Sequence, residues 1–117
     1  MRFVGSVSDV RSLHAAANAF VLASLYDPFP NAALEALASG LPVVTTHKCG
    51  VAELLAEGES GFVRDALDVA GIADAMARLE PAVARRMGEA ARDAVSALTP
   101  QAMAGRYTAL YERLIRR

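Results

Sequence analysis

The chain has 117 residues, of which 54% are hydrophobic, 21% charged and 6% aromatic, and its formal net charge is −1. This length fits one domain, and no apolar run approaches the roughly 20 residues of a membrane-spanning helix. The near-neutral charge, without a long basic block, argues against a nucleic-acid partner. One cysteine and two histidines exclude an internal disulfide and argue against a structural zinc site, so no metal is expected.

The first half of the sequence alternates short β-type runs with helical patterns, which is typical of βαβ units around a parallel sheet. We therefore predict an α/β fold with about four parallel strands and flanking helices. In chain order the predicted strands are 2–5, 19–23, 41–46 and 61–64, and the predicted helices between them are 9–18, 31–39 and 50–56. The apolar strand 19–23 is expected to lie in the centre of the sheet, buried on both faces.

The β-type runs stop after residue 66, and three consecutive helices are predicted at 68–80, 81–98 and 100–115. A proline begins each of the last two, where its missing N–H is not needed. We divide a single domain, 1–117, into βα units over 1–64 and helices over 65–117. Core packing is predicted for apolar residues at helical spacing, which are Met76, Leu79, Val83 and Met87, then Met103, Tyr107, Leu110 and Leu114.

Residues 24–35 form a strand end that leads into a helix, the place where a parallel sheet binds ligands. Pro30 begins this helix, so the amides of residues 31–33 have no intrahelical acceptor. The positive end of the helix dipole adds to these free N–H groups. A phosphate group therefore fits this helix start.

Two carboxylates flank the predicted phosphate position. Asp27 lies just before the helix, and Glu35 lies one turn inside it, on the same face as Asn31. Carboxylates do not bind phosphate, but they accept hydrogen bonds from the hydroxyl groups of a sugar or a ribose. The pattern predicts a nucleotide sugar, although many surface helices also begin with proline and carry a glutamate, and the residues alone leave both interpretations open.

The same segment continues as Glu35-Ala-Leu-Ala-Ser-Gly-Leu-Pro-Val-Val-Thr-Thr46, with seven residues between Asp27 and Glu35. This pattern resembles the C-terminal donor-binding domain of GT-B retaining glycosyltransferases, especially the large bacterial group 1 (family 4) that uses sugar nucleotides. The continuation through Cys49-Gly50 is similar to the lipopolysaccharide-core glucosyltransferase branch. The resemblance implies a truncated Rossmann-like sheet, half of a GT-B C-terminal domain, and a uridine diphosphate hexose as the donor, with no separate cofactor.

The resemblance also implies a role for each matching position. Glu35 would hold the ribose, and Asp27 would act as the catalytic acidic residue that binds the hydroxyls of the transferred sugar. The residues expected at the donor sugar and diphosphate are Asp27, Phe29, Pro30, Asn31 and Ala32. Two positions depart from the family: aspartate replaces the more frequent glutamate at 27, and Pro30, where many members have glycine, has no N–H to donate.

Family members are typically several hundred residues long, with an acceptor-binding N-terminal domain and an Arg and a Lys that neutralise the donor diphosphate. The strand order implies that this chain starts at the third strand of the second domain. An N-terminal half is therefore an expected partner, and slow or absent sugar transfer is expected of the chain alone. Lys48, the only lysine, is interpreted as a solvated loop residue rather than as a replacement cation.

Other interpretations follow from the same residues. A non-catalytic α/β module that acts by binding or self-association is the main alternative, and an unrelated small α/β regulator is a distant one. Without the neighbours of strand 19–23, either strand 2–5 pairs beside it or chains associate through exposed sheet edges, and we expect a homo-oligomer. No signal peptide pattern precedes residue 30, which favours the cytoplasm, free or at the inner face of the membrane.

Overall fold

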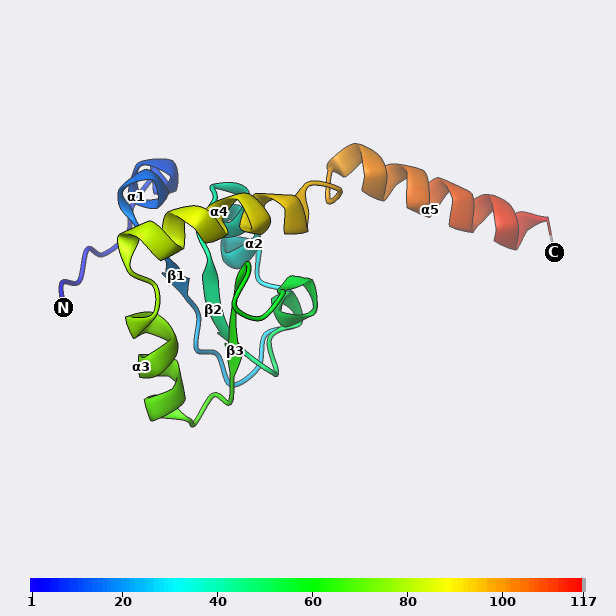
Figure 1. Ribbon diagram of the computed structural model, residues 1–117. Coiled ribbons are helices and arrows are strands. Elements are labelled where there is room, and N and C mark those ends of the chain that lie inside the picture. The colour runs from blue at the N-terminus through cyan, green and yellow to red at the C-terminus, as the bar shows by residue number, and fades with distance from the viewer. Residues whose placement is uncertain (117) are drawn as a thin grey trace.

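The computed structural model describes residues 1–116, which form a three-stranded parallel sheet with helices around it (Figure 1). In chain order the elements are α1 (Val10–Ala16), β1 (Phe20–Val21), α2 (Asn31–Ala38), β2 (Val43–Thr46), the 3₁₀ helix η1 (Gly50–Leu54), β3 (Gly61–Arg64), α3 (Val69–Ala77), α4 (Pro81–Val95) and α5 (Pro100–Ile115). The α/β class is confirmed, and so are the predicted elements at 31–39, 61–64 and 100–115, within a residue.

The strand order is β1-β2-β3, with β2 in the centre and fully buried. Successive residues of β2 point to opposite faces of the sheet. Val43 packs against α2 and η1 on one face, whereas Val44 packs against Phe62 and Ala75 on the other. Helix α4 lies across the upper end of the sheet in Figure 1 and contributes to both clusters.

Two predictions about the sheet are wrong. No strand forms at 2–5, so the described sheet has three strands rather than about four, and this segment does not pair beside β1. Gly5 has a φ of +74°, which turns the backbone out of an extended path, and Phe3 is 86% exposed. Strand β1 is therefore an edge strand with a single partner, not a central one, and Val21 is 38% exposed.

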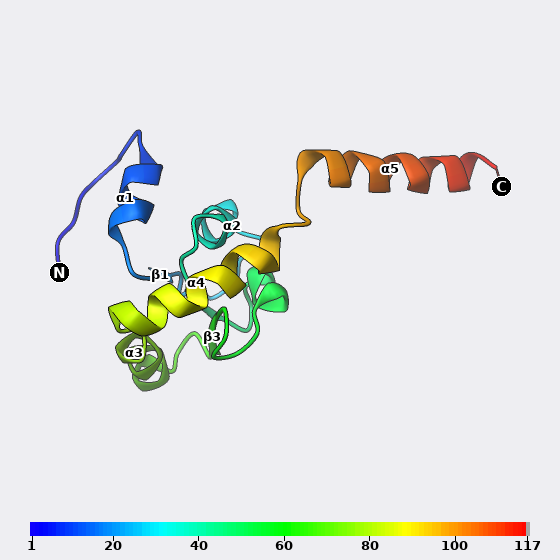
Figure 2. The same ribbon diagram turned by 45° about the horizontal axis from the view of Figure 1, so that its top comes forward.

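The predicted core packing of the last helix is also wrong. Leu79 and Met87, from the earlier apolar set, are buried, but Met76 is 50% exposed and α5 contains no buried residue. Helix α5 extends away from the sheet and its flanking helices (Figures 1 and 2), so its apolar side chains do not pack into the core of the described residues. The molecule is accordingly elongated, with principal extents of 55 × 30 × 29 Å.

Candidate functional site

The segment after β1 is held along β2 by two threonine hydroxyls. Thr45 Oγ1 donates to the Leu22 carbonyl at 3.1 Å, and Thr46 Oγ1 donates to the Ser24 carbonyl at 2.6 Å. Both threonines are buried, and β-branched residues suit a strand. These bonds extend the contact between the two chain segments beyond the two residues of β1 and direct residues 24–30 to the carboxyl end of the sheet.

Asp27 is fixed by its backbone against the segment that follows β2. Its N–H donates to the Lys48 carbonyl at 3.1 Å, and its carbonyl accepts from the Gly50 N–H at 2.9 Å. A Cβ atom at Gly50 would lie 1.8 Å from the Pro28 carbonyl oxygen, so only glycine permits this approach. Among the described residues, the half-buried Asp27 side chain makes no hydrogen bond or ion pair, and its carboxylate is available to a ligand.

The N-terminus of α2 presents free amides, as predicted. Pro30 is the N-cap residue, with extended backbone angles of −73° and 120°, and no side chain caps the helix. The first intrahelical bond runs from the Leu34 N–H to the Pro30 carbonyl at 3.3 Å. The amides of residues 31–33 precede that bond and have no intrahelical acceptor. Asn31 and Ala32 are exposed, so an anion can reach this helix end.

Glu35 lies in a groove between α1 and α2, away from Asn31. The groove is lined in addition by Ser8, Asp9, Arg11, His14 and Ser39. Asn31 lines a second groove, between α2 and α5. Asn31 and Glu35 thus belong to two different grooves, although four residues separate them along α2. Arg11 is the cation of Glu35's groove. Sequence reasoning did not find Arg11, because it lies far from Glu35 in sequence and only the packing of α1 beside α2 brings the two together.

His14 has a structural role. The ring is 8% exposed and packs edge-on against Phe20. Its Nδ1 lies 3.1 Å from Ser39 Oγ, which itself donates to the Glu35 carbonyl at 2.8 Å. The hydroxyl oxygen can thus accept a bond from the imidazole, and the three residues tie α1 to the last turn of α2.

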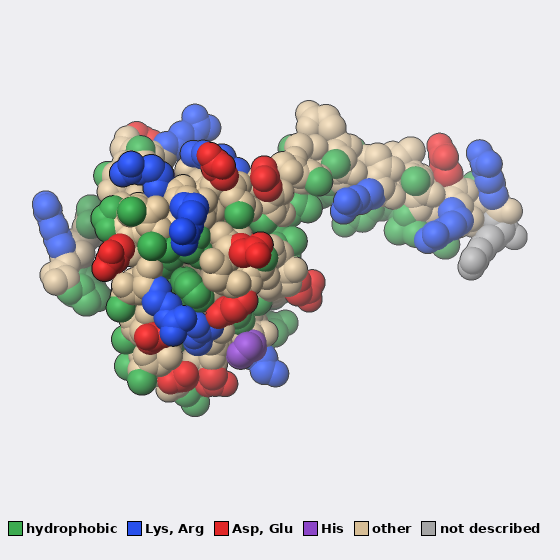
Figure 3. Space-filling model, in the orientation of Figure 1, with side chains coloured by type: hydrophobic (Ala, Val, Ile, Leu, Met, Phe, Trp, Pro, Cys, Tyr) green, Lys and Arg blue, Asp and Glu red, His purple; other side chains and the backbone are tan. Residues whose placement is uncertain are grey.

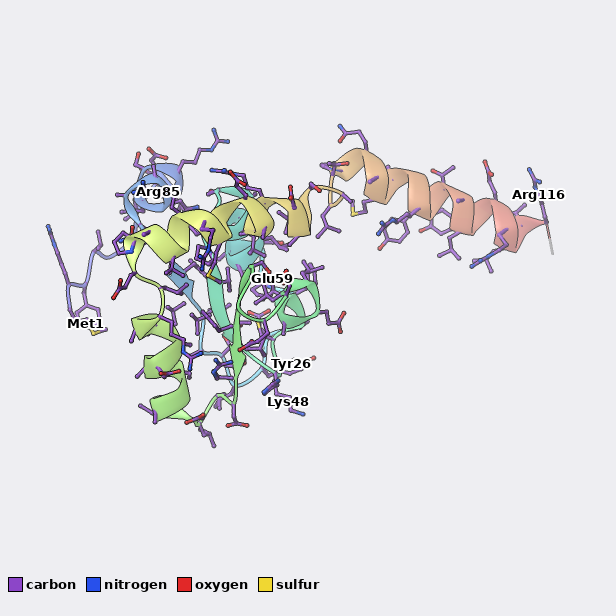
Figure 4. The ribbon with its side chains drawn as sticks, in the orientation of Figure 1. Met1, Tyr26, Lys48, Glu59, Arg85 and Arg116 are labelled. Atoms are coloured by element: carbon purple, nitrogen blue, oxygen red, sulfur yellow. The ribbon has the colours of Figure 1, made fainter. Side chains whose placement is uncertain are left out.

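The polar residues Cys49, His47 and Lys48, which follow β2, differ in their exposure. Cys49 is 2% exposed and belongs to the core cluster around α2, which makes it a packing residue. His47 and Lys48 are exposed beyond the end of β2. Figure 4 shows Tyr26 and Lys48 at the same end of the sheet, and the Asp27–Lys48 backbone bond joins their segments. Tyr26, 74% exposed, was not singled out from the sequence.

Neither a metal centre nor a membrane span is found in residues 1–116. No three His, Cys, Asp or Glu side chains of this part of the chain are grouped so that they could hold a metal ion. No helix within the same residues is long and apolar enough to cross a bilayer.

Comparison with known proteins identifies the family. Residues 1–80 match the family model described as "Glycosyl transferases group 1". A glycogen synthase from Mycobacterium tuberculosis is 41% identical over 95 residues, which are 78% of this chain and 23% of that protein. A lipopolysaccharide core biosynthesis glycosyltransferase, LpsE, from Rhizobium meliloti is 37% identical over 79 residues, 68% of this chain and 23% of that protein.

A solved structure supports the same assignment. Sucrose-phosphate synthase from Thermosynechococcus elongatus superposes with a TM-score of 0.80 at 34% identity, over 89% of this chain and 27% of that one. The chain thus spans less than a third of the length of these relatives. On the family match, the sequence identities and the shared fold, the chain belongs to the glycosyl transferases group 1 family and has the fold of a GT-B glycosyltransferase C-terminal fragment.

Proposed function

We propose that this chain carries the donor-binding surface of a retaining glycosyltransferase that uses a uridine diphosphate hexose and transfers the hexose to a glycan or lipopolysaccharide-type acceptor. The observation that carries the proposal is the uncapped start of α2. Its free amides lie at the carboxyl end of a parallel sheet, just after Asp27, and the Glu35 carboxylate lies one turn further along α2; neither carboxylate has a hydrogen-bond partner among the described residues. The matched LpsE protein supports the acceptor class.

The diphosphate would bind at the α2 N-terminus. The amides of the exposed residues Asn31 and Ala32 would donate to phosphate oxygens, and the helix dipole adds a favourable partial positive charge. Pro30 has no N–H, so the backbone donors begin at Asn31. The backbone hydrogen bonds between Asp27, Lys48 and Gly50 already hold the segment before the helix, so binding would require little rearrangement there.

The nucleoside would extend from that point into the groove between α1 and α2. Glu35 lies four residues beyond Asn31, which is about 6 Å along the helix axis. Its carboxylate, which has no hydrogen-bond partner among the described residues, can accept bonds from the ribose hydroxyls. Arg11 in the same groove provides a further donor.

The hexose would lie beside Asp27, on the other side of the phosphates. As the bond between the sugar and the diphosphate breaks, the electron pair leaves with the diphosphate, and positive charge develops on the sugar. A carboxylate that accepts hydrogen bonds from the sugar hydroxyls both orients the ring and stabilises that charge. Asp27 is shorter than glutamate by one methylene, so its position depends on the rigid backbone pairing with residues 48–50.

The proposal is tested by titrating the isotope-labelled chain with uridine diphosphate and with its glucose conjugate, followed by amide chemical shifts. Both ligands should shift the amides of residues 31–33. Glu35→Ala should weaken both ligands by roughly 10-fold to 100-fold, the value of a hydrogen bond to a charged group. Asp27→Ala should weaken the glucose conjugate and spare the free diphosphate.

Glu89→Ala is the matched control, because Glu89 is an exposed carboxylate on α4, away from the α2 N-terminus. Its removal should leave both titrations unchanged. Equal losses for both ligands in the Asp27 and Glu35 variants would contradict the separate roles. Shifts confined to other elements would contradict the site itself.

A further inference from the structure

The second half of the buried strand β2 carries hydroxyl groups. The strand consists of two valines followed by two threonines, and all four residues are buried. Thr46, the last of them, is 0% exposed, an environment that a valine of nearly the same shape would fit. A hydroxyl group in such a place costs free energy unless it is hydrogen-bonded. Thr46 Oγ1 donates to the Ser24 carbonyl at 2.6 Å, and this bond accounts for the hydroxyl.

The bond from Thr46 holds a stretch of chain that backbone pairing does not reach. The last backbone bond from the β1 segment to β2 is donated by the Leu22 N–H at 2.9 Å. Backbone pairing resumes only at the Asp27 N–H, which donates to the Lys48 carbonyl at 3.1 Å. Within the part of the chain that the structure describes, residues 23–26 make no backbone–backbone hydrogen bond. The Thr46 hydroxyl is therefore what ties this stretch to the sheet.

Thr46 lies at the border between the core and the candidate site. It is the last residue of β2, and the two residues that follow it, His47 and Lys48, are exposed. Figure 3 shows a histidine beside a basic side chain on the surface at this end of the sheet, where Figure 4 labels Lys48. The hydroxyl thus acts from a rigid, buried position on a segment that reaches the surface.

The stretch between Ser24 and Asp27 has little packing of its own. Leu25 is 68% exposed and Tyr26 is 74% exposed, so the core does not fix either side chain. The Asp27 carboxylate has no hydrogen-bond partner among the described residues that would set its direction. That direction therefore depends on the path of the backbone, which the Thr46 hydroxyl holds three residues before Asp27.

We propose that Thr46 is a positioning residue, whose buried hydroxyl holds the Ser24 carbonyl so that the Asp27 carboxylate faces the donor hexose. The inference rests on the proposed function, because it deepens the role given there to Asp27. Thr46 does not touch the donor. It acts on the sugar alone, since the diphosphate binds to the amides of α2, which this bond does not hold. Thr46 therefore sets how much more tightly the chain binds the sugar conjugate than the free diphosphate.

The test compares dissociation constants for uridine diphosphate glucose and for uridine diphosphate, measured by amide chemical shifts. Thr46→Val keeps the shape and removes the donor, and it should weaken the glucose conjugate by about 3-fold to 10-fold while sparing the diphosphate. Thr46→Ser keeps the hydroxyl and should restore the wild-type ratio of the two constants. Thr46→Cys has only a weak donor and should lower the ratio in the same direction as valine, which keeps the test open if the valine variant is unstable.

Ser60→Ala is the matched control. Ser60 is 2% exposed, and its hydroxyl oxygen accepts from the Ala56 N–H at 2.9 Å. The change thus removes a buried hydroxyl bond of the same sheet, but at the amino end of β3, away from the candidate site. It should lower the melting temperature as Thr46→Val does and leave the ratio of the two constants unchanged.

The same titrations in an Asp27→Ala background show whether Thr46 acts through Asp27. There Thr46→Val should change the ratio no further, because the carboxylate that it positions is absent. An equal loss in both backgrounds would overturn the role of Thr46, and so would an unchanged ratio in a Thr46→Val chain that binds both ligands. Either result would leave the proposed function standing. A wild-type chain that binds neither ligand would overturn both.

Discussion

The carboxylate of Glu57 makes two hydrogen bonds to residues of β3. Its Oε1 accepts from Arg64 Nη1 at 2.5 Å, and its Oε2 accepts from the Val63 N–H at 3.0 Å. Burial by itself raises the pKa of Glu57, but the bonds from Arg64 and Val63 outweigh it, and the pKa lies below the ordinary glutamate value. The carboxylate thus connects the turn before β3 to the strand itself.

A lowered pKa fixes the direction of the pH dependence. The contribution of Glu57 to stability is present above the unfolded pKa of about 4.3, and it is lost as the pH falls through the lower folded value. Glu57→Gln should therefore lower the melting temperature at neutral pH by a small amount, because the side chain is half exposed, and the difference should vanish in acid.

Thermal unfolding of both proteins between pH 2 and 7 measures this difference. Glu59→Gln provides the control, as Glu59 is exposed and makes no ion pair among residues 1–116 (Figure 4). A constant gap between wild type and Glu57→Gln over the whole pH range would show that the carboxylate charge is not involved.

Helix α4 is positioned on α2 by the contact of two glycines. A Cβ atom added at Gly88 would lie 2.5 Å from the Gly40 carbonyl oxygen, which is too close for any side chain. Gly40 itself has a φ of +81° and ends α2, and the Arg92 guanidinium lies against it. The C-terminal end of α2 is thus covered by α4, while its N-terminus stays open for a ligand.

Gly88→Ala should destabilise the body although alanine is the better helix former. The helix gains about 1 kcal/mol from alanine, and forced backbone separation costs about 1–3 kcal/mol. Gly105→Ala in α5 is the matched control, since nothing lies within 4 Å of the added Cβ. Calorimetry should show a lower melting temperature for the first variant only. A rise for both would mean that α4 moves freely away from α2.

Most elements followed from local patterns, and the failures have a common cause. Helix α2 was predictable because Pro30 begins it and Gly40 with Pro42 ends it, all within the segment itself. The proposed strand at 2–5 and the central position of β1 depended on neighbours that no local pattern specifies. Whether an apolar run pairs, and on which side, is decided by distant segments.

The candidate site could be predicted to a similar extent. The free amides of α2 followed from the proline and the helix start, and the structure contains them. The hydroxyl bonds of Thr45 and Thr46 were not predicted, because threonine in a strand indicates β propensity and not a side-chain bond. The place of Arg11 in Glu35's groove depends on how α1 packs on α2, and no spacing in the sequence encodes that contact.

On the proposed function, the chain alone should bind the uridine diphosphate sugar donor but should not transfer its sugar at a measurable rate. Departure of a nucleoside diphosphate develops negative charge, and the loss of one donor to such a charge costs about 100-fold to 1000-fold in rate. Lys48 is the only lysine, and it is exposed beyond β2. We expect the purified chain to transfer no glucose from labelled uridine diphosphate glucose to an acceptor faster than the background reaction in buffer. Multiple turnovers would contradict this.

The absence of buried residues in α5 has a consequence for the rates at which different parts of the molecule open to solvent. The strands and α2, α3 and α4 share two core clusters, so their amides can open to solvent only when those clusters separate. Opening α5 exposes no core, so we expect its amides to exchange faster than those of the body. We therefore expect two units that unfold separately, so that a substitution that destabilises one leaves the stability of the other unchanged.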